Sequence, residues 1–200
     1  MRRALLVLED GAAFEGRSIG HHGTCAGEVV FSTSMTGYQE MLTDPSYAGQ
    51  ILTLTYPLIG NYGVADEDFE SRAVQVAGFV VRQLCDVPSH LRSGETLQRF
   101  LDRHRVIGIE GIDTRALTRR LRAEGVMMGL LTSELDVDQA RARLREAPAY
   151  ASVNYVRKVS TPEPYVWECE PAVNGDRTYE VALVDCGVKY NIMRSLAALG

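Results

Sequence analysis

Cys186 is the residue whose type and position most directly suggest chemistry, because a cysteine thiolate is a strong nucleophile. It follows an apolar segment and precedes Gly187 and an amphipathic stretch, an order similar to the strand–turn–helix of a nucleophile elbow. Such an elbow usually has small residues on both sides of the nucleophile, and here Asp185 precedes it. No histidine follows His104 in the chain, so a histidine base would have to come from the preceding domain.

A free cysteine is more often a small buried apolar side chain than a nucleophile, and we adopt that interpretation for Cys186. The alternative that stays open is a cysteine hydrolase whose base is one of the histidines, His21, His22, His90 or His104. An unreactive Cys186 thiol in alkylation kinetics would exclude this alternative.

A metal site is the second chemical option, because His21 and His22 lie three or four residues before Cys25. No third or fourth ligand is apparent, so we predict a polar loop there and no metal. The cysteines at positions 25, 85, 169 and 186 are widely spaced and contain no C-x-x-C pair, so no disulfide framework is predicted. No phosphate-binding glycine motif occurs, so the chain is expected to hold no cofactor of its own.

The stretch from Ser32 to Tyr47 is the most informative part of the chain for binding, because it is polar, rich in hydroxyl groups and flanked by apolar segments. It contains the turn Asp44-Pro45-Ser46, in which proline fixes φ and the aspartate side chain can accept a hydrogen bond from the backbone. Loops held between rigid strands are common binding sites. Composition alone supports only a surface loop here.

Composition places the chain among ordinary soluble domains and excludes several classes of partner. The 200 residues are 46% hydrophobic and 24% charged, with a net charge of −5. This balance favours neither nucleic acid nor an anionic membrane as a partner. No apolar run approaches the roughly 20 residues that span a bilayer, and no signal peptide is apparent, so a cytoplasmic protein is expected.

The elements that must position these residues are predicted from apolar periodicity and from capping residues. Strands are expected over 4–8, 13–16, 28–34, 50–56, 76–81, 106–109 and 126–131. Helices are expected after three N-caps, which are Ser93, Asp113 and Asp136. The result is a mixed α/β domain over residues 1–150, with strands first and helices later.

A second domain is expected to begin near the end of the chain. Residues 151–178 hold several prolines and no apolar period, so we interpret them as a linker. The segment 179–186 then predicts a strand, and the stretch after Gly187 predicts a helix. One strand–helix unit cannot bury both its faces, so 179–200 is expected to be the truncated start of a doubly wound domain. The alternative is that these residues dock on the first domain as its last strand and helix.

A long ordered resemblance connects these features. The run from Gly27 to Gly63, which includes STSMTGYQEMLTDPSYAGQ, closely resembles the N-terminal domain of the carbamoyl-phosphate synthetase small chain. Three further segments resemble the same family in order and spacing, at 5–11, 108–115 and 184–192. The resemblance therefore covers essentially the whole chain.

The resemblance implies a function in which the small chain hydrolyses glutamine and passes ammonia through a tunnel to a large chain. The large chain uses ATP, Mg and bicarbonate to make carbamoyl phosphate for the arginine and pyrimidine pathways. In this family the glutaminase is a class I amidotransferase with a Cys nucleophile, a His base and a Glu that orients it. None of these three residues falls within the chain, so the 200-residue piece is expected to be inactive alone.

The resemblance also implies a fold and two glutamine-binding residues. The first domain is expected to have a swivelling β/β/α fold, and 179–200 to begin a flavodoxin-like amidotransferase domain. Ser46 and Lys189 match family positions that contribute to glutamine binding. Cys186 stands where the family usually has an aromatic residue, which agrees with a packing role. The expected partner is the large chain, and the alternative is a non-catalytic scaffold homologue of an ammonia-using synthetase.

Overall fold

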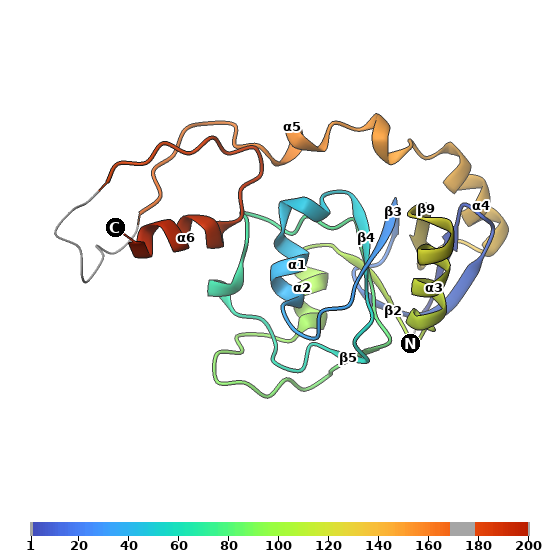
Figure 1. The fold of residues 1–200 in the computed structure, drawn as a ribbon. Helices are drawn as coiled ribbons and strands as arrows, with labels where there is room; N and C mark the ends of the chain where they lie inside the picture. Colours follow the sequence, from blue (N-terminus) through green and yellow to red (C-terminus); the bar gives the residue numbers. More distant parts are fainter. Residues whose placement is uncertain (1, 169–178, 200) are drawn as a thin grey trace.

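Seven strands close into a barrel in the computed structural model, which describes residues 2–168 and 179–199 (Figure 1). The order around the barrel is β1-β2-β8-β6-β4-β3-β9. The pairs from β3 through β4 and β6 to β8 are parallel, and the remaining pairs are antiparallel. The strand bounds are β1 Arg3–Leu8, β2 Ala13–Gly20, β3 Thr24–Ser32, β4 Gln50–Leu54, β6 Gly78–Val80, β8 Ile107–Glu110 and β9 Met127–Thr132.

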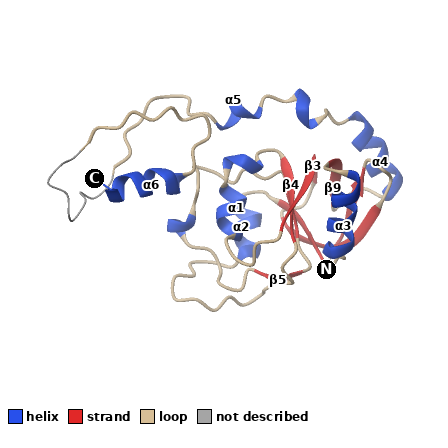
Figure 2. Cartoon of the chain, in the orientation of Figure 1, coloured by secondary structure: helices blue, strands red, loops and turns tan. Residues whose placement is uncertain are grey.

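Helices lie on both sides of the barrel strands (Figure 2). The helices are α1 Tyr38–Thr43, α2 Leu97–Arg103, α3 Thr114–Glu124, α4 Val137–Glu146, α5 Tyr155–Val159 and α6 Tyr190–Leu199. Short 3-10 turns occur at η1 Pro45–Tyr47, η2 Asp66–Asp68 and η3 Tyr150–Ser152, and a small parallel pair is formed by β5 Leu58–Ile59 and β7 Gln83–Leu84. In the view of Figure 2, α1 and α2 lie on one side of β4, with α3 and α4 on the other.

The two main cores lie on opposite faces of β4, because successive side chains of a strand point in opposite directions. Leu52 packs in one core with Tyr38 of α1 and Phe100 of α2. Ile51 packs in the other core with Leu117 of α3. The sheet is thus covered on both faces, which gives α1 and the turn after it a rigid base.

The strands and two of the helix starts agree with the sequence predictions. All seven predicted strands of the first domain are present, with shifted ends. Asp113 caps α3 through the Ala116 N–H, and Asp136 with Gln139 forms the predicted capping box of α4. These features depend on local sequence, which explains why the patterns revealed them.

Two helix predictions were wrong or incomplete. The N-cap of α2 is Thr96, whose hydroxyl accepts a hydrogen bond from the Arg99 N–H, and not Ser93 as predicted. Ser93 instead donates to the Glu95 carbonyl in the preceding loop. The helix α1 was predicted as part of a surface loop, because residues 32–47 are polar and rich in hydroxyl groups and turn formers. In the structure Gly37, at φ 82°, is its N-cap.

The segment 179–186 is extended but is not a strand, which contradicts the prediction. A strand needs a neighbour for its N–H and C=O groups, and the closed barrel offers no free edge to it. The alternative, that these residues dock on the first domain as its last strand and helix, is wrong for the strand but agrees with the structure for the helix, which is bonded to Glu70. The helix α6 that follows is present as predicted. The division into 1–150, 151–178 and 179–200 stays a prediction.

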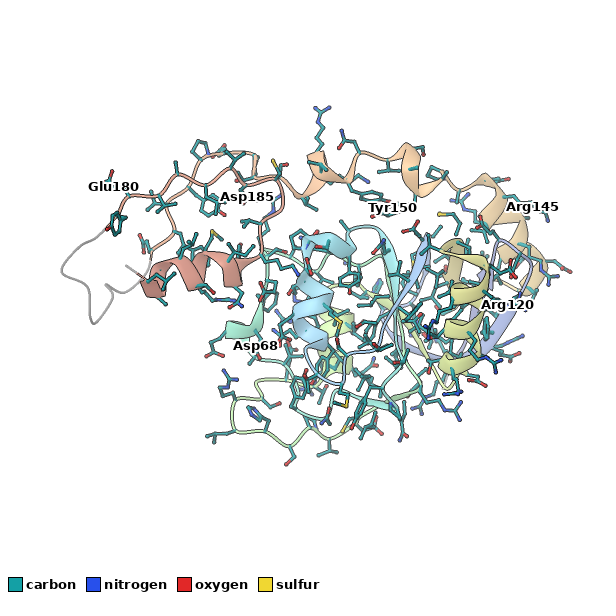
Figure 3. All side chains as sticks on the ribbon, in the orientation of Figure 1. Asp68, Arg120, Arg145, Tyr150, Glu180 and Asp185 are labelled. Carbon is teal, nitrogen blue, oxygen red and sulfur yellow. The ribbon has the colours of Figure 1, made fainter. Side chains whose placement is uncertain are left out.

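The linker is attached to the first domain through Tyr155, whose ring stacks on Tyr150 at the end of that domain. Tyr150 is labelled in Figure 3. The Tyr150 hydroxyl donates to the Ala48 carbonyl over 3.0 Å, and the Tyr155 ring stacks on Tyr150 at 4.5 Å. Tyr155 also covers Gly49, where an added Cβ would lie 2.2 Å from its ring. Gly49 has φ +73°, so both space and backbone favour glycine there.

Candidate functional site

The turn Asp44-Pro45-Ser46 follows α1 directly and forms η1. Asp44 is buried, and its Oδ1 accepts a hydrogen bond of 2.8 Å from the Ser46 backbone N–H, which confirms the predicted turn. Ser46 is exposed, and among residues 2–168 and 179–199 its hydroxyl has no hydrogen-bond partner. The hydroxyl can therefore bond a ligand.

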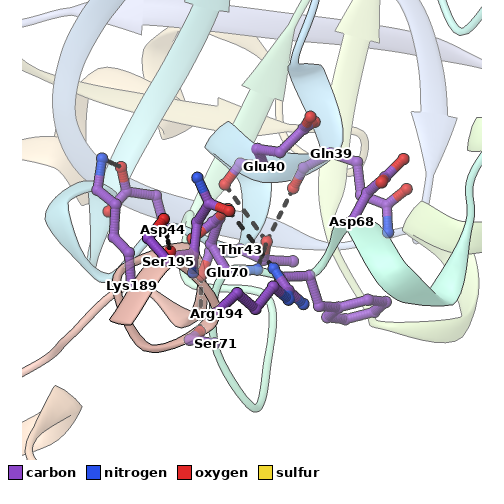
Figure 4. A network of polar contacts seen from close by, with 12 residues as sticks. Gln39, Glu40, Thr43, Asp44, Asp68, Glu70, Ser71, Lys189, Arg194 and Ser195 are labelled. Carbon is purple, nitrogen blue, oxygen red and sulfur yellow. Dashed lines mark hydrogen bonds and ion pairs between the residues drawn. The ribbon is translucent and has the colours of Figure 1, made fainter. Parts of the chain in front are cut away.

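Lys189 reaches the same aspartate from the C-terminal segment (Figure 4). Its Nζ lies 2.7 Å from Oδ2 of Asp44, while Oδ1 keeps its bond to Ser46. The hydrogen bond to Asp44 raises the pKa of Lys189, so the lysine is charged at neutral pH. The structure therefore brings the two predicted glutamine-binding residues, Ser46 and Lys189, onto one carboxylate.

Asp185 shapes the backbone that presents Lys189. Its Oδ1 accepts hydrogen bonds from the N–H groups of Gly187 and Val188, at 2.8 and 2.9 Å, and its Oδ2 accepts one from the Tyr165 hydroxyl at 2.8 Å. Burial alone would raise the pKa of Asp185, but these donors hold it below its usual value. The tight turn that results carries the chain toward Lys189 and α6.

Gly187 in this turn lies directly against the turn of the first domain. Its φ is +103°, and an added Cβ would come within 3.2 Å of the Pro45 Cβ and 2.6 Å of the Val159 side chain. Any larger residue would therefore push the C-terminal segment away from η1. This close approach keeps Lys189 within reach of Asp44.

Glu70 provides a second attachment between the two parts of the chain. Its carbonyl accepts from the Tyr190 N–H over 2.9 Å, and its Oε2 accepts from the Asn191 N–H over 3.0 Å. Arg194, one turn further along α6, donates to the Phe69 carbonyl over 2.9 Å. The start of α6 is therefore bonded to the loop that contains η2.

A groove of about 480 Å³ opens between α1 and α6. Its first wall is acidic, with Glu40, Asp44 and Glu70, and its second wall is largely apolar, with Ile192 and Leu196 of α6. Lys189 lies at the groove as well. The groove combines charged groups for orientation with apolar area for contact, as small-molecule sites commonly do.

Glu40 lines both this groove and a neighbouring pocket of about 290 Å³. Its Oε2 is buried without a hydrogen-bond partner among the residues that the structure describes. Burial raises the pKa of Glu40, and the nearby carboxylates of Asp68 and Glu70 raise it further. The ionised Glu40 carboxylate therefore lowers the stability of the folded protein at neutral pH.

The comparison with known families gives a direct result for the barrel. Residues 6–131 match the family described as carbamoyl-phosphate synthase small chain, CPSase domain. This match covers the strands, α1 and the turn that holds Ser46. The chain belongs to the carbamoyl-phosphate synthase small-chain family.

Similar proteins share this description beyond the barrel. The carbamoyl phosphate synthase small chain of Syntrophotalea carbinolica is 45% identical over 207 residues, which cover 99% of this chain and 55% of the relative. The small chain of Nitratidesulfovibrio vulgaris Hildenborough is 48% identical over 212 residues, covering 99% and 56%. That of Thermotoga maritima is 46% identical over 200 residues, covering 100% and 50%. The chain spans about half the length of the curated relatives it matches.

The burial predicted for Cys186 in this small-chain homologue is wrong. Cys186 is exposed, as are its apolar neighbours Val181 and Val184, because the segment that carries them has no strand beside it. Within the described residues no hydrogen bond, ion pair or ring contact links Cys186 to any of the four histidines. His104, for example, packs against the rings of Phe69 and Phe100. The structure thus gives no support to a cysteine hydrolase built on Cys186.

The histidines near Cys25 do not form a metal site in the described part of this small-chain homologue. His21 contacts Asp102, and His22 contacts Ser18. Cys25 is partly buried against the core, and the desolvation of its thiol raises the pKa to about 12. No group of three or more His, Cys, Asp or Glu side chains in this part could hold a metal ion.

Sequence reasoning missed three carboxylates at the groove of this family member. Asp44 was recognised only as a turn residue, although its place beside Pro45 and Ser46 was a usable signal. Glu70 and Glu40 had no signal, since their roles depend on α6 packing near α1.

Across the described residues no helix is both long and apolar enough to cross a bilayer.

Proposed function

We propose that this chain is the N-terminal part of the glutamine-hydrolysing small subunit of a carbamoyl-phosphate synthase. In this proposal the subunit releases ammonia from glutamine and delivers it to a large subunit, which makes carbamoyl phosphate. The observation that carries the proposal is the Asp44 carboxylate, which joins the Ser46 turn to Lys189 at the α1–α6 groove.

The chemistry of these groups suits glutamine. A free amino acid presents a carboxylate, an ammonium and, in glutamine, a side-chain amide. The Ser46 hydroxyl can donate to the carboxylate or the amide oxygen and can accept from the ammonium or the amide NH2, and the Lys189 ammonium can donate to the carboxylate or the amide oxygen. Asp44 bonds both the Ser46 backbone and the Lys189 side chain, so a ligand could contact Ser46 and Lys189 at the same time.

In this proposal, the cysteine and histidine that hydrolyse glutamine are not among the residues of this chain. A glutaminase of this kind needs a thiolate paired with a histidine. Cys186, the exposed cysteine, has no histidine contact among the described residues. We therefore propose that the 200 residues contribute substrate contacts and the docking domain for the large subunit, and that alone they do not hydrolyse glutamine.

The test is Ser46→Ala in the full-length small subunit, assembled with its large subunit. We expect the KM for glutamine to rise about three- to tenfold, since one hydrogen bond to the substrate is lost. The rate of carbamoyl phosphate synthesis from added ammonia should stay unchanged, because ammonia bypasses the glutamine site.

The matched control is Ser152→Ala, which removes another exposed serine hydroxyl from η3, far from Asp44 in the sequence. It should leave both nitrogen donors unaffected. Equal losses with glutamine and ammonia in Ser46→Ala would show that Ser46 acts in folding or docking. A full-length subunit that never supports synthesis from glutamine would overturn the proposed function itself.

A further inference from the structure

We infer that Glu70 is a positioning residue that caps α6 from the first domain and so fixes Lys189 at the glutamine groove. This inference rests on the proposed function, because it assigns Lys189 to glutamine binding. Glu70 lines the groove, and the inference assigns its main effect to the backbone of α6 that it holds.

The first N–H groups of a helix have no partner within the helix and need one from outside. A cap usually comes from the residue just before the helix, but Lys189 has no acceptor in its side chain. Glu70 supplies both acceptors from another part of the chain, its carbonyl for Tyr190 and its carboxylate for Asn191. A carboxylate at this end also interacts favourably with the helix dipole.

Glu70 is itself held firmly, as a positioning group must be. The residue is 8% exposed. Its backbone N–H donates to the Thr43 hydroxyl over 2.9 Å, and the next residue, Ser71, donates to the Thr43 carbonyl over 2.6 Å (Figure 4). Thr43 is the last residue of α1, so the cap is attached to the helix that ends at the Asp44 turn.

Asp44 and Glu70 together hold three consecutive residues, 189 to 191. Asp44 binds the side chain of Lys189, and Glu70 binds the backbone of Tyr190 and Asn191. Because Thr43 and Asp44 are adjacent, the attachments share one base on α1. A change at Glu70 should therefore shift the Lys189 backbone relative to Asp44 and weaken glutamine binding, without changing the chemistry of any group in contact with substrate.

The experiment compares Glu70→Ala, Glu70→Gln and the control Glu67→Ala in the full-length subunit with its large subunit. We expect Glu70→Ala to raise the KM for glutamine about tenfold, as loss of a charge-assisted hydrogen bond does. Glu70→Gln keeps an acceptor for the Asn191 N–H and should recover most of this loss. Glu67 is exposed in the same loop, and its removal should change nothing. Synthesis from ammonia should stay within about twofold throughout.

A double-variant cycle with Lys189→Ala separates positioning from general stability. If Glu70 acts through Lys189, Glu70→Ala should add little to the KM of a subunit that already lacks the lysine. Full additivity of the two effects would overturn the inference, as would an unchanged KM in Glu70→Ala.

Hydrogen exchange gives a readout that does not depend on activity. The amide of Asn191, which loses its carboxylate acceptor, should exchange at least about tenfold faster in Glu70→Ala, while amides in β4 keep their protection. If the unmodified subunit cannot use glutamine at all, the proposed function fails, and unchanged exchange at α6 would then overturn the capping role separately. If Glu70→Ala does not fold, the same two measurements on Glu70→Met, which keeps the length of the side chain but removes the acceptor for the Asn191 N–H, decide the matter, with wild-type values in that variant overturning the inference.

Discussion

Two segments of this chain have similar apolar patterns, but one forms a buried strand and the other forms no strand and is exposed. The strand β4 pairs with β3 on one side and β6 on the other, and its side chains from Ile51 onward are fully buried. The segment 179–186 is as apolar, yet Val181 is 65% exposed and Val184 is 88% exposed. Both segments could form a strand, but only the first has neighbours to pair with. Pairing partners, and not the local pattern, decide which segment becomes a strand.

The two regions are consequently held in different ways. The barrel is stabilised by buried apolar area on both faces of its sheet. The described contacts of residues 185–194 with the first domain are largely polar, through Asp44, Glu70 and the Phe69 carbonyl. Partly exposed polar contacts contribute less free energy than a core, so the two regions should respond differently to the same kind of change.

The largest expected difference comes from removing apolar side chains. Phe79→Ala in β6 should lower the free energy of unfolding by about 3–5 kcal/mol, because Phe79 is fully buried in the barrel. Val184→Ala should change it by no more than about 0.5 kcal/mol. Denaturant unfolding of the 200-residue chain measures both. A large loss in Val184→Ala would mean that the C-terminal segment is packed more tightly than the structure shows.

The next comparison is between a carboxylate that bonds an arginine within the barrel and a carboxylate that bonds a lysine across the contact between the two regions. Glu110 is 4% exposed, accepts from the Arg17 Nε over 2.6 Å, and accepts from the Leu84 N–H over 2.9 Å. We expect Glu110→Ala to cost about 3 kcal/mol in denaturant unfolding, because a partly buried guanidinium and a buried N–H lose their acceptor.

The change at the contact between the two regions is Asp44→Asn, which removes the charge that faces Lys189 but keeps an acceptor for the Ser46 N–H. Because the Lys189 side chain is 45% exposed, solvent screens this pair, and the cost should stay at or below about 1 kcal/mol. Equal costs at Glu110 and Asp44 would contradict the idea that the barrel and the C-terminal segment are held differently.

The smallest predicted effect is a gain in stability, and it concerns Glu40, which lines the groove between the two regions. The folded protein raises the pKa of Glu40 above its ordinary 4.5, so the group lowers stability as pH rises through that range. Glu40→Gln should therefore increase the free energy of unfolding at pH 7 by up to about 1 kcal/mol. Below about pH 4.5 the carboxyl is protonated in both folded and unfolded states, and the variant should have no advantage.

Thermal unfolding of the wild type and Glu40→Gln at pH 4 and pH 7 measures this effect. Glu67→Gln, which removes an exposed charge nearby, serves as the control and should have no such pH dependence. A gain for Glu40→Gln of the same size at both pH values would mean that packing, and not ionisation, is responsible.

The sequence predicted the barrel strands and the caps Asp113 and Asp136 because each depends on a few neighbouring residues. The closure of the sheet could not be predicted, since it depends on pairs such as Leu8 with Gly129 that are distant in the chain. That same closure explains the failure of the predicted strand at 179–186, which finds no open edge.

In the candidate site, too, the contacts between residues distant in the sequence could not be predicted. Ser46 and Lys189 came from a family resemblance and lie together at Asp44. The role of Glu70 could not be predicted, because a glutamate in an acidic loop has no pattern that points to a helix 120 residues later. Only the packing of α6 near α1 makes it a cap.

The attachment of Tyr150 to Ala48 has a consequence for how strongly the end of the chain is retained. Tyr150 and Lys189 are both fixed on the short stretch from Asp44 to Ala48, so the chain between them forms a loop whose two ends meet on one turn. A tether of this kind confers an effective concentration of the order of millimolar. Contacts that would be too weak between separate molecules can then keep α6 in place. A single cut within that loop would convert the association into an ordinary bimolecular equilibrium, and dilution alone would release the helix.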